Sequence, residues 1–438
     1  MGTGQREKFD NSVIDWIDQR LPIFTLLDKE YGKFPVPKNF NYFWNFGAIA
    51  MFMLVTMILT GLFLTMHYVP HEDHAFNSVE RIMRDVNQGW LIRYLHLNGA
   101  SFFFIAIYIH MFRGMYYGSF KKPRELMWIL GVVILFLMMA TAFMGYTLPW
   151  SQMSGWGAKV ITGFVTAIPF IGDTLHTWLL GGFTVDNPTL KRFYSLHFLL
   201  PFVIVGVVFL HVWALHISGS NNPTGIEPKS KQDTIPFHPY YTMKDIFGLT
   251  VFLLLFLVVT FFYPTSLTHA DHFVEFQPLV TPPHIVPEWY FLPFYAILRA
   301  WTFDIPIPFT DVPLITAKLG GVILLFGSVA ILFFLPWLDT HPVRSARYRP
   351  LYKASLFALL LAVVALGYVG AKPVEQPYVA IGQIATLYYF AYFLLILPLL
   401  SRYEKARPMP NSIHEAVLEK RQGKPAKRPG TLSPEPAE

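Results

Sequence analysis

Residues 93–113 read RYLHLNGASFFFIAIYIHMFR, an apolar stretch of helix length with His96 near one end and His110 near the other. Residues 197–211, HFLLPFVIVGVVFLH, repeat the pattern with His197 and His211, again fourteen positions apart. At 100° and 1.5 Å per residue, fourteen positions return to within about 40° of the same helix face and advance about 21 Å. Each stretch therefore predicts two histidines on one face, at two depths of a long apolar helix.

Eight apolar stretches, including these two, are long enough to cross a bilayer, which requires about 20 residues. They lie near 45–67, 94–117, 127–148, 196–217, 246–263, 315–337, 354–371 and 380–400. Hydrophobic residues make up 53% of the 438-residue chain and charged residues only 14%, so most of the chain must lie where charge is costly. The sequence predicts an all-α membrane protein with eight transmembrane helices, the first four of which form a bundle.

The connectors divide the chain into five regions. We expect an N-terminal segment (1–44), the first four membrane helices (45–217), an inner loop (218–245), the last four membrane helices (246–402) and a mobile tail (403–438). Two outer connectors, 149–193 and 264–312, are long and contain aromatic and Gly/Pro clusters, which predict surface segments with short helices.

Lysine and arginine are distributed unevenly between the two sets of connectors. The set that includes the N-terminal segment and the tail carries 24 of the 34, and the alternating set carries 8. The positive-inside rule therefore predicts that both termini are cytoplasmic and that the two long connectors face outward. The net charge of +6 belongs to these loops, and no basic run interleaved with aromatics predicts nucleic-acid binding. The expected partner of the apolar surface is the lipid bilayer.

The chain contains no cysteine, which excludes disulfides, thiolate iron–sulfur clusters and covalent heme attachment on this chain. The two histidine-bearing helices run in the same direction, so facing each other they would place His96 level with His197 and His110 level with His211. A single histidine inside a membrane more often hydrogen-bonds a neighbour or lines a proton path. The repeat in two helices instead predicts two bis-histidine sites, each holding a non-covalent b-type heme that carries electrons.

Arginines and glycines support these two sites. Arg93 and Arg113 each lie three positions from a histidine on its interfacial side, where a heme propionate would need a partner; simple snorkelling is the alternative. Two glycine pairs in the first and third stretches share the spacing of fourteen: Gly47 with Gly61, and Gly131 with Gly145. Missing side chains at these depths would admit a flat macrocycle, and ordinary packing of small residues is the alternative.

Six sequence motifs are typical of one known family: RYLHLNGAS, HMFRGMYYGSFKKPRE, GYTLPWSQMSGWGAKVIT, SLHFLLPF, NNPTG and PPHIVPEWYFLPFYAILRA. Together they resemble the cytochrome b subunit of bacterial-type respiratory cytochrome bc complexes (quinol–cytochrome c oxidoreductases), over about residues 10 to 402. The resemblance implies that His96 and His197 hold an outer low-potential heme, and His110 and His211 an inner high-potential heme. It also implies a homodimeric complex with a Rieske iron–sulfur protein and a c1-like cytochrome, in a bacterial plasma membrane rather than a mitochondrial inner membrane.

The resemblance further implies two quinone pockets and a Q cycle that couples electron transfer to proton translocation. The outer pocket, for quinol oxidation, would involve Phe143, Tyr146, Gly157, Pro287, Glu288, Trp289 and Tyr295. The inner pocket, for quinone reduction, would involve His216, Ser220, Lys244 and Asp245. Quinol oxidation releases two protons, so Glu288 is a plausible acceptor, with Tyr146 and Tyr295 as further catalytic groups. Without the resemblance, the residues themselves favour a solvated loop acid for Glu288 and a helix-start residue for Asp245.

The sequence departs from the family pattern at a few positions. Ser151 and Gly155 stand where glycine and an aromatic are usual, Lys159 replaces a small polar residue, and Ser220 stands where asparagine is frequent. Two other classes of protein stay open. A secondary transporter would show broken helices with charges near the midplane. A di-heme membrane anchor of another quinone-linked oxidoreductase would lack the long PEWY-bearing loop.

Overall fold

The computed structural model describes residues 8–310 and 312–422. Within these ranges, eight helical segments are long and apolar enough to span a membrane, which confirms the predicted number. The spans are α3 (Phe46–Thr65, preceded by η2, Tyr42–Asn45), α5 (Gly89–Tyr117), α6 (Glu125–Thr147), α9 (Asn187–Ser218), α10 (Tyr240–Phe262), α12 (Ala317–Ala330, continued by η7, Ile331–Phe334, and α13, Leu335–Leu338), α14 (Pro350–Gly370) and α15 (Tyr378–Ala391, continued by η9, Tyr392–Ile396, and α16, Leu397–Tyr403).

Helices α5 and α9 begin well before the apolar stretches expected from about residues 94 and 196. The start of α9 is defined by capping: the Asp186 carboxylate accepts a hydrogen bond from the Asn187 amide, Pro188 occupies the first turn, and Asp186 and Thr189 form a capping box. Hydropathy reports where the bilayer begins, whereas capping reports where the helix begins. The two differ because these helices begin before their apolar stretches.

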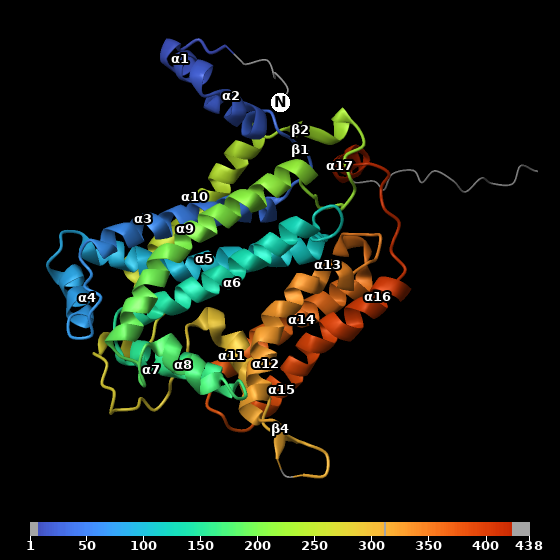
Figure 1. Cartoon of the computed structure of the whole chain (residues 1–438). Helices are drawn as coiled ribbons and strands as arrows, with labels where there is room; N and C mark the ends of the chain where they lie inside the picture. The colour runs from blue at the N-terminus through green and yellow to red at the C-terminus, as the bar shows by residue number, and fades with distance from the viewer. Residues whose placement is uncertain (1–7, 311, 423–438) are drawn as a thin grey trace, which may run out of the picture.

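The first four spans form two packed pairs, α3 with α5 and α6 with α9. Helix α10 packs on α5 and α3, and the C-terminal spans surround α11 (Leu292–Ala300), which contacts α12, α14 and α15. Figure 1 shows the long helices side by side across the molecule. The two pairs of the N-terminal bundle therefore face each other, with α5 and α9 supplying the histidines from opposite sides.

Short elements gather at both ends of the helices (Figure 1). One end carries α4 (Ala75–Arg84), α7 (Gln152–Thr162), η3 (Gly163–Ala167), α8 (Gly172–Leu180), η5 (Ala270–Phe273), η6 (Trp289–Phe291) and the hairpin β3 (Ile305–Pro306) with β4 (Pro313–Ile315). The other end carries α1 (Ser12–Arg20), α2 (Ile23–Leu27), η1 (Asp28–Gly32), η4 (Lys231–Asp233), η8 (Ala346–Tyr348), α17 (Ile413–Gln422) and the antiparallel strands β1 (Pro35–Pro37) and β2 (Thr234–Pro236), which pair Val36 with Ile235. Of the predicted tail, residues 423–438 lie outside the described part.

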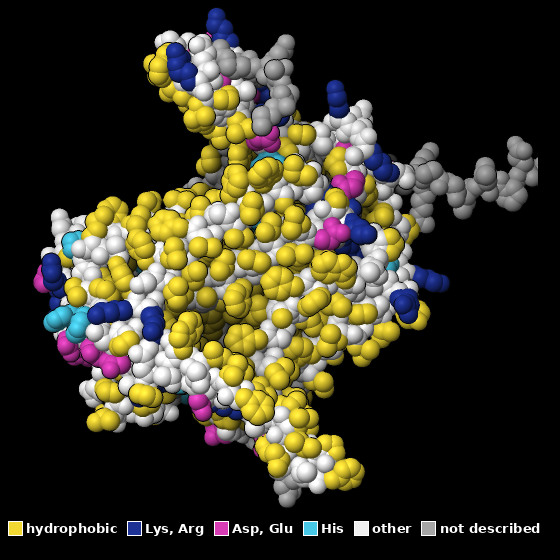
Figure 2. All heavy atoms as spheres, viewed as in Figure 1, with side chains coloured by type: hydrophobic (Ala, Val, Ile, Leu, Met, Phe, Trp, Pro, Cys, Tyr) yellow, Lys and Arg dark blue, Asp and Glu magenta, His cyan; other side chains and the backbone are white. Residues whose placement is uncertain are grey.

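The distribution of side chains on the surface matches the predicted lipid bilayer environment. Figure 2 shows hydrophobic side chains over the middle of one face, with charged side chains gathered toward its ends. At the end that carries β1 and β2, four buried charges join the two halves of the chain: Lys121 Nζ lies 2.8 Å from Asp339 Oδ2, Arg349 Nη1 2.7 Å from the same oxygen, and Arg349 Nε 3.0 Å from Glu404 Oε2. Because opposite charges compensate one another, this cluster can remain buried.

Candidate heme and quinone sites

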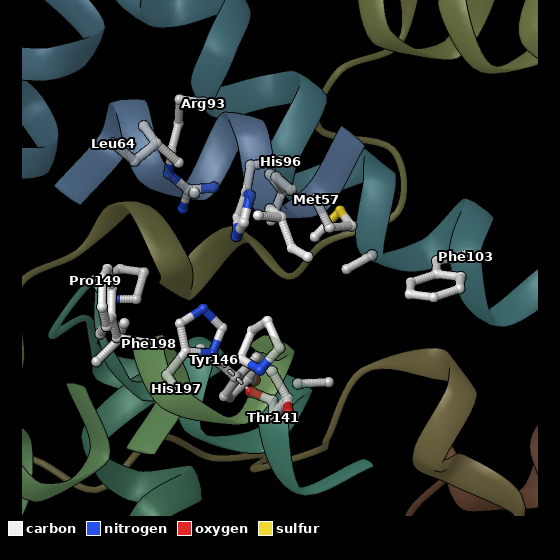
Figure 3. A pocket seen from close by; sticks show the side chains of 18 of the residues that line it. Met57, Leu64, Arg93, His96, Phe103, Thr141, Tyr146, Pro149, His197 and Phe198 are labelled. Atoms are coloured by element: carbon white, nitrogen blue, oxygen red, sulfur yellow. Dashed lines mark hydrogen bonds between the residues drawn. The ribbon is translucent and has the colours of Figure 1, made fainter. Parts of the chain in front are cut away.

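The outer histidine pair faces across a cavity between the two packed pairs of helices. His96 on α5 and His197 on α9 point toward each other from opposite walls (Figure 3), with ring centres 6.2 Å apart. Metal–imidazole bonds are about 2 Å long and a ring nitrogen lies about 1 Å from its ring centre, so two imidazoles on one ion have centres about 6 Å apart. The observed separation fits a single metal ion held between the rings.

Hydrogen bonds fix which nitrogen of each outer histidine faces the cavity. His197 Nδ1 lies 2.8 Å from the Thr141 carbonyl oxygen, which can only accept, so Nδ1 carries the proton. His96 Nδ1 lies 2.9 Å from the Thr60 hydroxyl, whose own proton goes to the Thr56 carbonyl at 2.7 Å. Both rings are therefore held as Nδ1–H donors, which leaves the lone pairs of both Nε2 atoms for a metal.

The inner pair repeats the spacing of the rings but not the hydrogen bonds, because Arg113, which can only donate, faces His110 Nδ1. The rings of His110 and His211 have centres 6.3 Å apart, and Arg113 Nη2 lies 3.2 Å from His110 Nδ1. The described residues contain no group of three or more His, Cys, Asp or Glu side chains able to hold a metal. Two histidines per site suit an iron whose other four ligands come from a porphyrin. The donor sets at both depths therefore fit b-type hemes.

The four glycines lie against the histidine rings. A Cβ on Gly145 would lie 2.4 Å from His197 Cε1, and one on Gly61 would lie 3.2 Å from His96 Cε1. On Gly47 and Gly131 the corresponding distances, to His110 and His211, are both 3.4 Å. Gly145 and, less closely, Gly61 thus make room for an imidazole, a reason that sequence reasoning missed, whereas a Cβ on Gly47 or Gly131 would only touch its ring.

The cavity around the outer pair is mostly apolar and extends toward the outer connectors. Its lining includes Arg93 beside the histidines, and also Tyr146, His272, Glu288 and Tyr290. A flat apolar macrocycle with charged propionates fits such a lining, because Arg93 is a cation on an otherwise apolar wall. The same cavity thus joins the outer histidine pair to the predicted proton acceptor.

Glu288 is nearly buried and has neighbours that the sequence did not reveal. Its side chain is 11% exposed, Thr268 Oγ1 donates to its Oε1 at 3.3 Å, and His272 Nε2 lies 3.6 Å from the same oxygen. Burial raises the pKa of the Glu288 carboxyl to about 7, although the Thr268 hydrogen bond and the charge of Arg93 act in the opposite direction. A carboxyl that titrates near neutral pH can both accept and release a proton.

The other predicted outer residues have varied surroundings. The Tyr146 hydroxyl donates to the Val286 carbonyl at 3.3 Å, and a Cβ on Gly157 would lie 3.1 Å from the Tyr146 ring. The Trp289 indole donates to Ser101 Oγ at 3.0 Å, toward α5. Of the residues predicted for the outer pocket, the cavity lining includes Tyr146 and Glu288. It does not include Phe143, Gly157, Pro287, Trp289 or Tyr295. Phe143 packs on Phe193 instead, and Tyr295 lies under Arg299.

The residues predicted for the inner pocket meet the N-terminal segment. His216 packs against the rings of Tyr31 and Phe34, with ring centres 5.4 and 4.6 Å away. The Trp44 indole donates to Ser220 Oγ at 3.3 Å. Lys244 Nζ donates to the Phe40 carbonyl at 2.6 Å and lies over the Tyr42 ring, beside Asp245. Residues 31–44 thus cover the predicted pocket. No sequence motif indicated that this segment would lie there.

The unusual residues of the first outer connector also have partners. Ser151 Oγ lies 2.9 Å from His272 Nδ1. A Cβ on Gly155 would lie 2.3 Å from the Phe276 ring, so glycine is required for that ring to pack there. Lys159 lies over the Trp156 ring at 4.2 Å.

Comparison with known proteins agrees with this geometry. The family described as "Cytochrome b/b6/petB" matches residues 31–219, and "Cytochrome b(C-terminal)/b6/petD" matches residues 275–390. "Cytochrome b" of Rhodospirillum rubrum is 57% identical over 94% of this chain and 98% of its own length, and that of Rickettsia prowazekii is 56% identical over 92% and 98%.

A solved structure supports the same conclusion. The chain is similar to one titled "Hyperthermophilic respiratory Complex III", with a TM-score of 0.81 and 33% identity over 89% of this chain and 98% of that one. Eight membrane helices, two opposed histidine pairs and full-length relatives of known name agree with one another. The chain belongs to the cytochrome b family, and is the cytochrome b core of a bacterial complex III, a quinol–cytochrome c oxidoreductase.

Proposed function

We propose that this chain binds two b-type hemes, oxidises quinol at an outer site and reduces quinone at an inner site in a Q cycle. The observation that carries the proposal is the pair of opposed histidines at each of two depths, with ring centres 6.2 and 6.3 Å apart. Bound hemes would supply two one-electron carriers across the membrane. One electron from quinol would pass to a Rieske iron–sulfur partner, and the other would cross the membrane to the inner site, where quinone is reduced.

At the outer site, this chain's own residues would handle the proton. Glu288 lines the same cavity as the outer histidines, and its pKa of about 7 suits a base that accepts a proton from quinol. Tyr146 is held at the cavity wall by the Val286 carbonyl, where its hydroxyl can orient a quinol oxygen. Arg93, on the same lining, would bind a heme propionate.

At the inner site, His216, Lys244 and Asp245 would bind quinone and take up protons. Lys244 and Asp245 are adjacent at the start of α10, and His216 lies near the end of α9. The aromatic side chains of Tyr31, Phe34 and Tyr42 pack around two of these polar groups, so a flat quinone ring would find apolar walls and polar ends.

The proposed partners rest on the proteins that this chain resembles. A relative in Bradyrhizobium diazoefficiens named "Cytochrome b/c1" is 56% identical over 94% of this chain but only 58% of its own length. Its name supports a c1-like cytochrome as a partner, whereas the Rieske protein and the homodimer are proposed from the family resemblance. The excess of lysine and arginine at the end that holds the termini supports a cytoplasmic location for both.

The alternative of a di-heme anchor for another oxidoreductase is less well supported. An anchor needs no outer loop that lines the heme cavity, whereas Glu288 and His272 lie on the cavity that contains His96 and His197.

Heme extraction and a reduced-minus-oxidised spectrum of the purified complex test the proposal directly. We expect two extractable b hemes per chain, at different potentials, in a complex that oxidises quinol and reduces cytochrome c. One heme per chain, or heme without quinol oxidation by the complex, would contradict the proposal.

A further inference from the structure

Three polar side chains from separate segments meet beside the outer cavity. Ser151 precedes α7, His272 lies in η5, and Glu288 precedes η6. Ser151 Oγ lies 2.9 Å from His272 Nδ1, and the opposite ring nitrogen, Nε2, lies 3.6 Å from Glu288 Oε1. Ser151 is fully buried, and the His272 side chain is 9% exposed. Among the described residues, His272 Nε2 has no hydrogen-bond partner.

The hydrogen bonds around Ser151 fix the tautomer of His272. Ser154 Oγ donates to the Tyr146 carbonyl at 2.8 Å, since a carbonyl can only accept. In the contact of 2.9 Å between the two hydroxyls, Ser151 must therefore be the donor. With its only proton used there, Ser151 must accept from His272, so Nδ1 carries the ring proton. Neutral His272 then presents the lone pair of Nε2 to Glu288.

We propose that His272 is a positioning residue for quinol oxidation, which accepts a hydrogen bond from the Glu288 carboxyl after that carboxyl has taken a proton from quinol. A small rotation of the carboxyl would bring the 3.6 Å contact into hydrogen-bonding range. The proton stays on Glu288 in this step, and the hydrogen bond turns it away from the quinol oxygens. The inference rests on the proposed function, because it takes Glu288 as the proton acceptor.

Burial and the neighbouring charges favour a neutral Glu288 carboxyl beside a neutral His272 imidazole over an ion pair between the two. Burial, together with Arg93 and His269, lowers the pKa of His272 to about 3, whereas burial raises that of Glu288 to about 7. The proton therefore resides on the carboxyl and not on the imidazole. The charged and titratable groups near the pair come from α5, α6, η5 and η6: Arg93, Tyr146, His269, Asp271 and Tyr290.

Ser151 is one of the positions where this chain departs from the family pattern. A glycine there would offer no hydroxyl to His272 Nδ1, so the orienting contact is a property of this sequence.

Infrared titration of the protonated-carboxyl C=O stretch in the purified complex tests the inference, with the Glu288 band assigned by its loss in Glu288→Gln. His272→Phe keeps a ring against Tyr146, whose ring centre lies 4.4 Å from that of His272, but removes the acceptor. A hydrogen bond to the neutral form raises a carboxyl pKa, so its loss should lower the midpoint by about one pH unit and raise the stretching frequency. The acid limb of kcat/KM for quinol should move in the same direction.

Ser151→Ala provides an independent arm that keeps the imidazole. Without the hydroxyl, the Nε2–H tautomer becomes available and donates to the carboxylate, which also lowers the midpoint. His176→Asn is the matched control, since His176 on α8 contacts Thr162 instead of Glu288, and it should titrate like the parent.

An unmoved carboxyl band in both His272→Phe and Ser151→Ala would overturn the inference, whatever their turnover. Parent-like turnover in Glu288→Gln would instead overturn the role of Glu288 as base, so the two failures are distinguishable.

Discussion

Replacing Gly145 with alanine tests how tightly binding of the proposed outer heme depends on the position of His197. The added Cβ would lie 2.4 Å from Cε1, 2.9 Å from Nδ1 and 3.2 Å from Nε2 of the His197 ring. A rigid ring cannot bend away as the end of a long side chain can, so it must retreat by about 1 Å to restore van der Waals contact. The ring is also tied to α6, the helix that carries Gly145, by the hydrogen bond of 2.8 Å to the Thr141 carbonyl, which a retreat of the ring would break.

The size of the effect follows from these distances. Ligand distances at protein metal sites are held within about 0.2 Å, so a shift of about 1 Å breaks or greatly lengthens the bond to iron. Overpacking an interior costs about 1–3 kcal/mol in itself. Since about 1.4 kcal/mol is a factor of ten in an equilibrium constant, we expect the affinity for the outer heme to fall at least about tenfold.

Extracted heme per chain and the reduced-minus-oxidised spectrum are the measurements. Gly145→Ala should lose the outer low-potential component and retain the inner one. Gly131→Ala is the control, because its Cβ would lie 3.4 Å from His211 Cε1, an ordinary contact, and it should retain both hemes. Two hemes with parental spectra and potentials in Gly145→Ala would refute the reasoning.

Three further predictions concern the inner heme and the two quinone sites. His211→Leu should remove the inner heme while quinol still reduces the outer one in pre-steady-state spectra; unaltered hemes would contradict the ligand assignment. Asp245→Asn should slow reoxidation of the inner heme by quinone in a stopped-flow trace, and equal slowing of outer reduction would mean a structural role. Glu288→Gln should lower quinol–cytochrome c turnover at least about tenfold with both hemes bound. Because the Glu288 pKa is about 7 and the base acts when deprotonated, the parent rate should fall as pH drops through 7; the variant should lack that limb, and a parental pH profile would exclude Glu288 as base.

The number of membrane helices could be predicted from the sequence because hydropathy is a local property. Each span needs about 20 apolar residues, and all eight stretches correspond to helical segments of the fold. Their ends were less predictable, since the capping of α9 by Asp186 lies beyond the apolar stretch.

The facing of the histidines could also be predicted, because it follows from helical period and helix direction. Spacing of fourteen placed His96 opposite His197 and His110 opposite His211, and the structure has both pairs at that arrangement. The same spacing in the glycines was visible, but its cause was not, since only the packed helices show that each glycine touches an imidazole.

The sequence by itself determined the membrane helices, their number and the levels of the histidines, because each depends on residues close together in one helix. Only the tertiary structure decided the burial of Glu288, its approach to His272, the orienting contact of His272 with Ser151, and the covering of Lys244 by residues 31–44. These contacts join segments far apart in the chain through loops without a repeating pattern. Their energies depend on water exclusion and on individual atom distances, which no local periodicity encodes.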